Sequence, residues 1–200
     1  MQDTDISMGR VGLYCWGNHD AQYSQVFVFP AAVAFTDWVI DDPFERLSSR
    51  WAFVDRGSED GPSQWTVSGG QLRQTSSIRA GTRYGGSPVA AGTHALLSEV
   101  EASDFRLTVQ LASDARGALG ILFRHRDSEN YYCLAVSEAP SYRRLTKTVA
   151  GKVDVLWEDQ SSYVIRQEHL LTVDCIGQRL IGFFDGVQLF AVSDGDLSSD

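Results

Sequence analysis

The stretch EVEASD, residues 99–104, brings three carboxylates close together in the sequence. Glu99, Glu101 and Asp104 stand at positions i, i+2 and i+5. Side chains alternate between the two faces of a strand, so Glu99 and Glu101 would share one face. Hydrolysis of a glycosidic bond with retention needs two carboxyl groups about 5 Å apart. These residues are the catalytic candidates, although the segment also has the character of a turn into a strand, where carboxylates are usually only solvated.

Arginine and aromatic side chains offer a second chemistry, the binding of sugars. Alternation along residues 119–126 points Phe123 into the core and leaves Arg124 and Arg126 on the opposite sheet surface. Aromatic rings from neighbouring strands on that surface would pack against sugar rings, and guanidinium groups would donate to hydroxyls. The same cross-strand pairs also stabilise sheets that bind nothing. The predicted ligand-binding residues are Arg124, Arg126, Tyr132, Arg144 and Trp157.

Other catalytic and metal-binding chemistries find no support in the sequence. The four histidines lack the His-x-His or Glu-x-x-His spacing of a zinc site. No Gly-x-Ser-x-Gly elbow and no glycine-rich phosphate loop before a helix is present. The cysteines lie far apart in apolar, strand-like runs, where a free thiol behaves as a small buried hydrophobe. They are Cys15, Cys133 and Cys175.

The elements that must position these side chains are strands. In residues 105–113, FRLTVQLAS, apolar residues alternate with polar ones, as in a half-buried strand. Turn signals separate several such runs, among them an Asp-Gly pair at 185–186 that suits a tight hairpin. No helical stripe is convincing beyond one short turn within residues 44–51. The pattern predicts an all-β sandwich, jelly roll or barrel.

Composition and charge restrict the partners. The 200 residues are 43% hydrophobic and 22% charged, which is typical of a folded chain with one main core. A formal net charge of −9 argues against binding to nucleic acid or to an anionic membrane surface. No run reaches the roughly 18 apolar residues of a membrane span. The first residues carry no signal-peptide pattern, which says nothing about a longer parent protein.

A short repeat links the two ends of the sequence. Residues 3–7 are DTDIS and residues 194–198 are DGDLS. The first copy leads into GRVGLYCWGN, which has the pattern of closing strands, whereas the second leads to Asp200. We therefore interpret residues 1–29 as terminal strands of a preceding repeat that complete the sandwich. Residues 30–40 are a linker, and residues 41–200 are a domain without its own last strands.

The order of signatures from residue 41 onward resembles a known domain family. DDPFERLSSRWAFVDRG, GPSQWTVSGGQLRQTSSI, GALGILFRHRDSENYYCLAV and FFDGVQLFAVSDGDLSS occur in that order. The sequence is similar to the laminin-G-like, concanavalin A-like jelly-roll domain of bacterial multidomain proteins. The resemblance covers about 41–200 plus 9–28, in permuted order, and implies an antiparallel sandwich of two sheets. A shared fold does not fix function.

The resemblance also suggests two kinds of site. Glucanases on this fold carry Glu-x-Asp-x-x-Glu on one strand, and the acid order of residues 99–104 departs from that motif. A calcium ion is the second suggestion, since Asp37, Asp41 and Asp42 in DWVIDDPF supply the hard oxygens that Ca²⁺ prefers. No Asp-x-Asp-x-Asp-Gly loop accompanies them, and acidic linkers are usually only solvated.

The combined expectation is a non-catalytic carbohydrate-binding, lectin-type or adhesion module, with a glycan or neighbouring protein domains as partners. The resemblance favours an extracellular or cell-surface location. Two alternatives remain open: a spacer or interaction domain in a large assembly such as an appendage or injection machine, and a glycosidase-like hydrolase. Residues 9–29 are expected to dock beside residues 180–193. Docking onto another copy would give a strand-swapped homo-oligomer.

Overall fold

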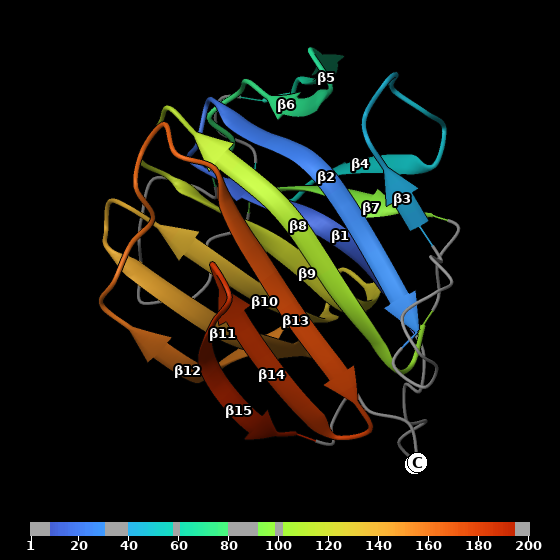
Figure 1. Ribbon diagram of the computed structural model, residues 1–200, viewed down its shortest axis with the longest axis vertical. Helices are drawn as coiled ribbons and strands as arrows, with labels where there is room; N and C mark the ends of the chain where they lie inside the picture. The colour runs from blue at the N-terminus through green and yellow to red at the C-terminus, as the bar shows by residue number, and fades with distance from the viewer. Residues whose placement is uncertain (1–8, 31–39, 58–60, 80–91, 99–101, 195–200) are drawn as a thin grey trace.

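The computed structural model describes residues 9–30, 40–57, 61–79, 92–98 and 102–194. These residues form two facing antiparallel sheets and contain no helix (Figure 1). The predicted all-β sandwich is confirmed. No helix within the described ranges is long and apolar enough to cross a membrane.

The sheet at the back of Figure 1 has seven strands. They are β1 (Arg10–Trp16), β4 (Trp51–Asp55), β7 (Thr93–Leu97), β9 (Ala118–Asp127), β10 (Asn130–Ser137), β11 (Tyr142–Val149) and β12 (Lys152–Asp159). Their order across the sheet is β12-β11-β10-β9-β1-β7-β4. The side of this sheet that faces away from the other sheet is called its outer face below.

The sheet at the front has eight strands. They are β2 (Ala21–Pro30), β3 (Ile40–Asp42), β5 (Trp65–Ser68), β6 (Gln71–Gln74), β8 (Phe105–Ser113), β13 (His169–Ile176), β14 (Arg179–Phe184) and β15 (Val187–Ser193). The order is β15-β14-β13-β8-β2-β6-β5, with β3 paired to β2. The chain passes between the sheets at β1–β2 and at β8–β9, as in a jelly-roll sandwich.

The core lies between the sheets and follows the predicted alternation. On β8, Phe105, Leu107, Val109 and Leu111 are buried, and the residues between them are half-buried. Inward-facing residues of β9, such as Phe123, join the same core cluster. The expected Asp-Gly hairpin is also confirmed, since Asp185 and Gly186 have φ angles of 50° and 78°.

The two N-terminal strands, β1 and β2, lie in the interior of different sheets. β1 lies between β9 and β7, and β2 lies between β8 and β6. The expectation that residues 9–29 dock beside residues 180–193 is wrong, because β14 and β15 are at the far edge of the eight-stranded sheet. The physical reason is the sequence RVGLYCW, in which all residues after Arg10 are buried. A strand that is buried on both of its faces belongs in the interior of a sheet, with a neighbouring strand on each side, and not at the edge.

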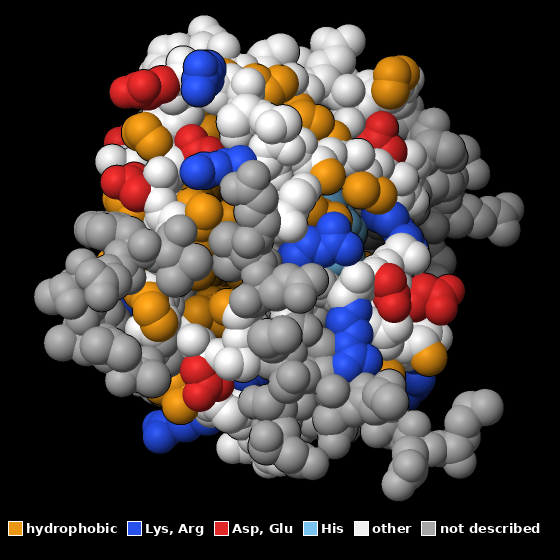
Figure 2. All heavy atoms as spheres, turned by 90° about the vertical axis from the view of Figure 1, so that its right-hand side faces the viewer, with side chains coloured by type: hydrophobic (Ala, Val, Ile, Leu, Met, Phe, Trp, Pro, Cys, Tyr) orange, Lys and Arg blue, Asp and Glu red, His pale blue; other side chains and the backbone are white. Residues whose placement is uncertain are grey.

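The described residues on both sides of the expected linker therefore contribute to one sandwich, and residues 31–39 of that linker lie outside the described residues. The origin of residues 1–29 in a preceding repeat stays a prediction. The three cysteines are free and buried, as expected, and burial raises the pKa of the Cys175 thiol to about 12. The sequence has a net charge of −9, yet the side of the molecule drawn in Figure 2 carries basic side chains near its middle, beside histidine atoms.

Candidate functional site

Arg124 does not lie on the open surface of its sheet, where alternation placed it. The registers of β1 and β10 against β9 both shift beside this residue, and its φ angle is 45°. This β-bulge turns the guanidinium inward, where the side chain is fully buried. Its Nη2 donates to the carbonyl oxygen of Gly177 at 2.5 Å and to that of Ser103 at 3.4 Å. The prediction of a surface-exposed Arg124 is therefore wrong.

The other predicted binding residues are also divided between the two faces. Tyr132 is buried, stacks on Phe123 with ring centroids 5.3 Å apart and donates to Asp194 at 2.6 Å. Trp157 packs against the core, with its ring 5.2 Å from that of Phe190.

Arg144 instead lies on the outer face, ion-paired with Glu158 and 4.3 Å above the Tyr142 ring. Arg126 is half-buried near the end of β9. The predicted common surface of five residues does not form, because the bulge after Phe123 breaks the alternation on which it was based.

The catalytic and calcium candidates take different positions. Glu99, Glu101 and Asp37 lie outside the described residues. Asp104 is half-buried and accepts from the amide of Gly177 at 2.8 Å, which makes it part of a turn.

Asp42 is buried, and its two carboxylate oxygens accept from the amide of Phe44 at 2.9 Å and from the indole of Trp51 at 2.8 Å. Its neighbour Asp41 is exposed, since successive residues of β3 point to opposite sides. Within the described ranges, no three His, Cys, Asp or Glu side chains gather as metal ligands would. The catalytic and calcium roles stay predictions.

The outer face of the seven-stranded sheet carries a second, largely aromatic cluster that the sequence interpretation missed. Gly12 and Gly120 stand at outer positions where neighbouring backbone comes too close for a side chain; a Cβ at Gly120 would lie 2.2 Å from a backbone oxygen. The larger side chains of the face gather around them. The cluster consists of Tyr14, Trp16, Leu96, Ala118, Leu122, Tyr131, Cys133 and Ala135, with Tyr142 packed against it.

A hollow opens where this face meets the loops after β1 and before β9. It has a volume of about 390 Å³. Its lining residues include Trp16, which is 5% exposed, together with Arg79, Arg116, Asp114 and His19. We call it the Trp16 hollow. It combines an apolar ring with forked donors and an acceptor in one concave site.

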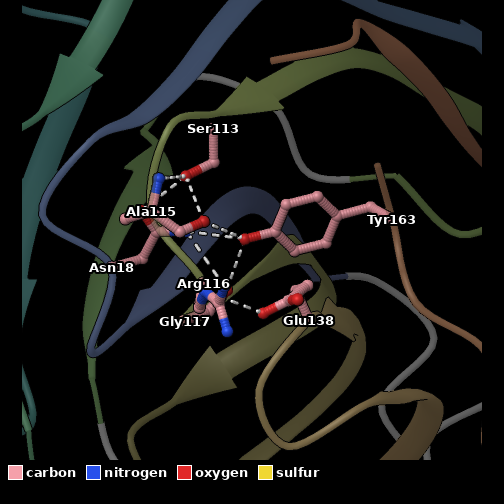
Figure 3. A network of polar contacts seen from close by, with 7 residues as sticks. All are labelled: Asn18, Ser113, Ala115, Arg116, Gly117, Glu138 and Tyr163. Atoms are coloured by element: carbon pink, nitrogen blue, oxygen red, sulfur yellow. Dashed lines mark hydrogen bonds and ion pairs between the residues drawn. The ribbon is translucent and has the colours of Figure 1, made fainter. Parts of the chain in front are cut away.

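A buried network of hydrogen bonds fixes the loop beneath the Trp16 hollow (Figure 3). Asn18 is fully buried; its Nδ2 donates to Gly117 O at 3.1 Å and its Oδ1 accepts from Ser113 Oγ at 2.8 Å. The hydroxyl of Tyr163 lies 2.5 Å from Ala115 O and 2.9 Å from Gly117 O. Burial raises the pKa of Tyr163 to about 12, so this hydroxyl remains a donor.

Two ion pairs complete the surroundings of this loop. Arg116 lies 3.5 Å from Glu138 at the surface, as Figure 3 shows, and Asp114 lies 3.7 Å from Arg166. The loop that presents Asp114 and Arg116 is therefore held from below by buried side chains and from the sides by exposed charges.

The residues of the Trp16 hollow were missed because they come from four separate parts of the sequence. A search along single strands does not bring them together. The available signal was the pair of polar turns WGNHD and SDARG, since functional side chains concentrate on loops carried by a rigid scaffold.

Comparison with known proteins gives one weak similarity. No family model and no curated protein matches this sequence. Among solved structures, the chain is similar to the carbohydrate-binding module CBM66 from Bacillus subtilis, at 18% identity and a TM-score of 0.39. That match covers 47% of this chain and 73% of the other. Membership of the laminin-G-like family stays a prediction.

Proposed function

We propose that this chain is a non-catalytic carbohydrate-binding module and that it holds a glycan in the Trp16 hollow. The observation that carries the proposal is the composition of that hollow, in which one tryptophan, two arginines and one aspartate are among the residues that line a single concavity. Its volume of about 390 Å³ falls within the roughly 300–1,000 Å³ typical of small-molecule sites.

The side chains of the hollow match the two surfaces of a sugar. The Trp16 ring offers an apolar wall for the C–H face of a pyranose or furanose. Arg79 and Arg116 offer forked donors for pairs of hydroxyls, and Asp114 offers an acceptor. The buried network under the loop supports binding further, because a loop that is already ordered loses little entropy when the ligand arrives.

Binding is favoured over hydrolysis by the state of the nearby carboxylates. Asp114 is engaged by Arg166, and Glu138 is engaged by Arg116. Among the described residues that line the hollow, Asp114 is the one carboxylate, so the hollow does not present a pair of carboxyl groups. A glycosidase needs two carboxyl groups that face the scissile bond.

The proposal is tested by glycan-array screening of the wild-type chain, followed by titration calorimetry with the best ligand. Arg116→Met should weaken binding about tenfold, because a charge-assisted hydrogen bond is lost. Its side chain is 71% exposed, so the fold should not change. Lys152→Met is the matched control, since Lys152 is 77% exposed and lies on the edge strand β12. Trp16→Ala should remove binding altogether.

Three results would overturn the proposal. Equal affinities of the wild type, Arg116→Met and Trp16→Ala would show that the glycan binds elsewhere. A wild-type chain that binds no glycan on the array would favour the spacer or interaction role. Release of reducing sugar from the bound glycan would favour the hydrolase.

A further inference from the structure

A second polar group lies on the same outer face, away from the Trp16 hollow. It consists of Arg10, Arg56, His94, His125 and Tyr131, and we call it the arginine–histidine cluster. Arg10 stands opposite His125 in the pairing of β1 with β9. Arg56 follows β4 directly, and its amide donates to Gly92 O at 2.7 Å. The cluster thus draws on five different strands or their ends.

The rings of the cluster hold each other in place. His125 stacks on Tyr131 with centroids 5.6 Å apart, and His94 meets the Tyr131 ring edge-on at 5.7 Å. The two imidazoles are 6.2 Å apart, and the Tyr14 ring lies 5.9 Å from His94. His94 and His125 are 1% and 5% exposed. Both imidazoles therefore have a fixed position before any ligand binds.

Polar atoms in this cluster are left without partners. The Nδ1 atoms of His94 and His125 are buried and make no hydrogen bond. A buried polar atom without a partner is uncommon, because its desolvation is not compensated. Two such atoms in neighbouring rings indicate that something else completes their hydrogen bonds.

The cationic side chains are also uncompensated. In the part of the chain that the structure describes, neither Arg10 nor Arg56 forms an ion pair, although the sequence has a net charge of −9. Arg56 is exposed and Arg10 is half-buried, so a ligand can reach both.

Their charges act on the imidazoles. Burial, His125 and Arg56 lower the pKa of His94 to about 3, and burial and Arg10 lower that of His125 to about 4. The nearby carboxylates of Asp55 and Asp127 oppose these shifts. Both carboxylates are already occupied by hydrogen bonds in their own turns, from Ser63 and Glu129 respectively.

We infer that the arginine–histidine cluster binds an anionic group, a carboxylate, sulfate or phosphate, carried by an acidic glycan. The guanidinium forks suit paired oxygens of such a group, and neutral imidazoles supply N–H donors beside them. β1 runs from Arg10 to Trp16, a length of about 20 Å. One extended acidic glycan can therefore reach both the cluster and the Trp16 hollow. The glycan part of this inference rests on the proposed function.

The experiment uses inorganic sulfate, a neutral oligosaccharide and an acidic oligosaccharide with the intact chain. Sulfate should shift the imidazole NMR signals of His94 and His125 in the wild type. Arg56→Met should weaken sulfate binding at least about tenfold. Arg179→Met is the matched control, because it removes the same charge from an exposed position on the eight-stranded sheet and should change nothing. The acidic sugar should bind more tightly than the neutral one, and Arg56→Met should remove that preference.

The outcomes separate the two proposals. If sulfate moves neither histidine and acidic sugars gain nothing, the anion site is overturned, while glycan binding through Arg116 can still stand. If sulfate binds through Arg56 but no sugar binds, the anion site stands with a free ion as its ligand and the proposed function is overturned. Equal weakening by Arg56→Met and Arg179→Met would show only a general charge effect and would overturn the site. Circular dichroism spectra and melting temperatures establish that each variant is folded.

Discussion

The two sheets treat the polar side chains on their exposed faces differently. On the eight-stranded sheet, neighbouring strands β8 and β13 pair such side chains with one another. Arg106 binds Asp174 through two contacts of 2.5 and 2.6 Å. Two further pairs extend this ladder: Thr108 with Thr172 at 3.0 Å, and Gln110 with Glu168 at 2.7 Å.

The arginine–histidine cluster on the other sheet has no comparable internal pairing. Arg106 and Arg56 are the same residue type in an acidic molecule, yet only Arg106 has a carboxylate directly across from it. Cross-strand pairs stabilise a sheet and leave little for a ligand. The seven-stranded sheet also has such a pair, Arg144 with Glu158, so the contrast lies between the ladder and the arginine–histidine cluster rather than between whole faces.

The largest effect is expected from deleting residues 1–29. Both faces of the comparison depend on the two N-terminal strands, because β1 carries Arg10 and β2 pairs with the ladder strand β8. The deletion should leave no folded protein, and the product should aggregate through its unpaired strands. Circular dichroism and size-exclusion chromatography measure this. A soluble deletion variant with the wild-type spectrum would contradict the observed positions of β1 and β2 inside the two sheets.

The second-largest effect is expected for Asn18→Ala, in the network under the Trp16 hollow. The variant leaves Gly117 O and Ser113 Oγ with fewer partners in a buried setting, which should lower the free energy of unfolding by about 3 kcal/mol. Denaturant unfolding measures the change. Asn130→Ala in an exposed turn serves as the control and should cost about 1 kcal/mol or less. Equal costs for the two variants would show that the loop under the Trp16 hollow is not specially held.

The pH dependence of stability sharpens the comparison, because the cluster contains two buried histidines whose pKa values folding lowers. Folding lowers the pKa of His94 from 6.5 to about 3 and that of His125 from 6.5 to about 4. Between these pKa values the unfolded chain therefore binds more protons than the folded chain. The stability that the two neutral histidines contribute is fully present above pH 6.5 and is lost as the pH falls. Each histidine contributes a slope of up to about 1.4 kcal/mol per pH unit.

Guanidinium unfolding of the wild type and of His125→Gln at pH 6.5, 5.8 and 5.0 tests this pH dependence. The variant should show the smaller slope, since one titrating imidazole is gone. A wild-type stability that does not change across this range would contradict the neutral, buried state of both rings.

The smallest effect is expected in the ladder. Arg106 is 36% exposed and Asp174 is 13% exposed, so solvent screens much of their attraction. A double-mutant cycle with Arg106→Met and Asp174→Asn should give a coupling energy of about 0.5–1 kcal/mol. Glycan affinity should be unchanged in both variants. A loss of glycan binding in Arg106→Met would place the ligand on the eight-stranded sheet and reverse the comparison.

Much of the fold follows from local patterns in the sequence. The alternation of Phe105, Leu107, Val109 and Leu111 identifies both the strand and its buried face. The pair Asp185-Gly186 identifies a hairpin because few residues adopt positive φ angles. The neighbours of β1 were not predictable in this way. Strand order depends on contacts between residues far apart in the sequence, which a period of two does not encode.

The candidate site was less predictable than the fold. Alternation placed Arg124 outside, whereas the bulge at that residue turns it inside and brings His125 to the outer face. A single inserted residue reverses every later side chain on a strand. The Trp16 hollow depends on residues from four regions of the sequence, and the arginine–histidine cluster depends on which arginines lack a carboxylate. Both properties follow from tertiary packing.

The interior position of the N-terminal strand β1 has a consequence for synthesis on the ribosome. β1 can pair only after its two neighbours have been made, which are β7 (Thr93–Leu97) and β9 (Ala118–Asp127). At an elongation rate of about 5–20 residues per second, the nascent chain carries this apolar strand without its partners for roughly 4–20 seconds. This buried interior strand is thus open to chaperones and to misassociation while the rest of the chain is being made. The yield of folded protein should therefore depend on the rate of translation, even though the finished sandwich is stable.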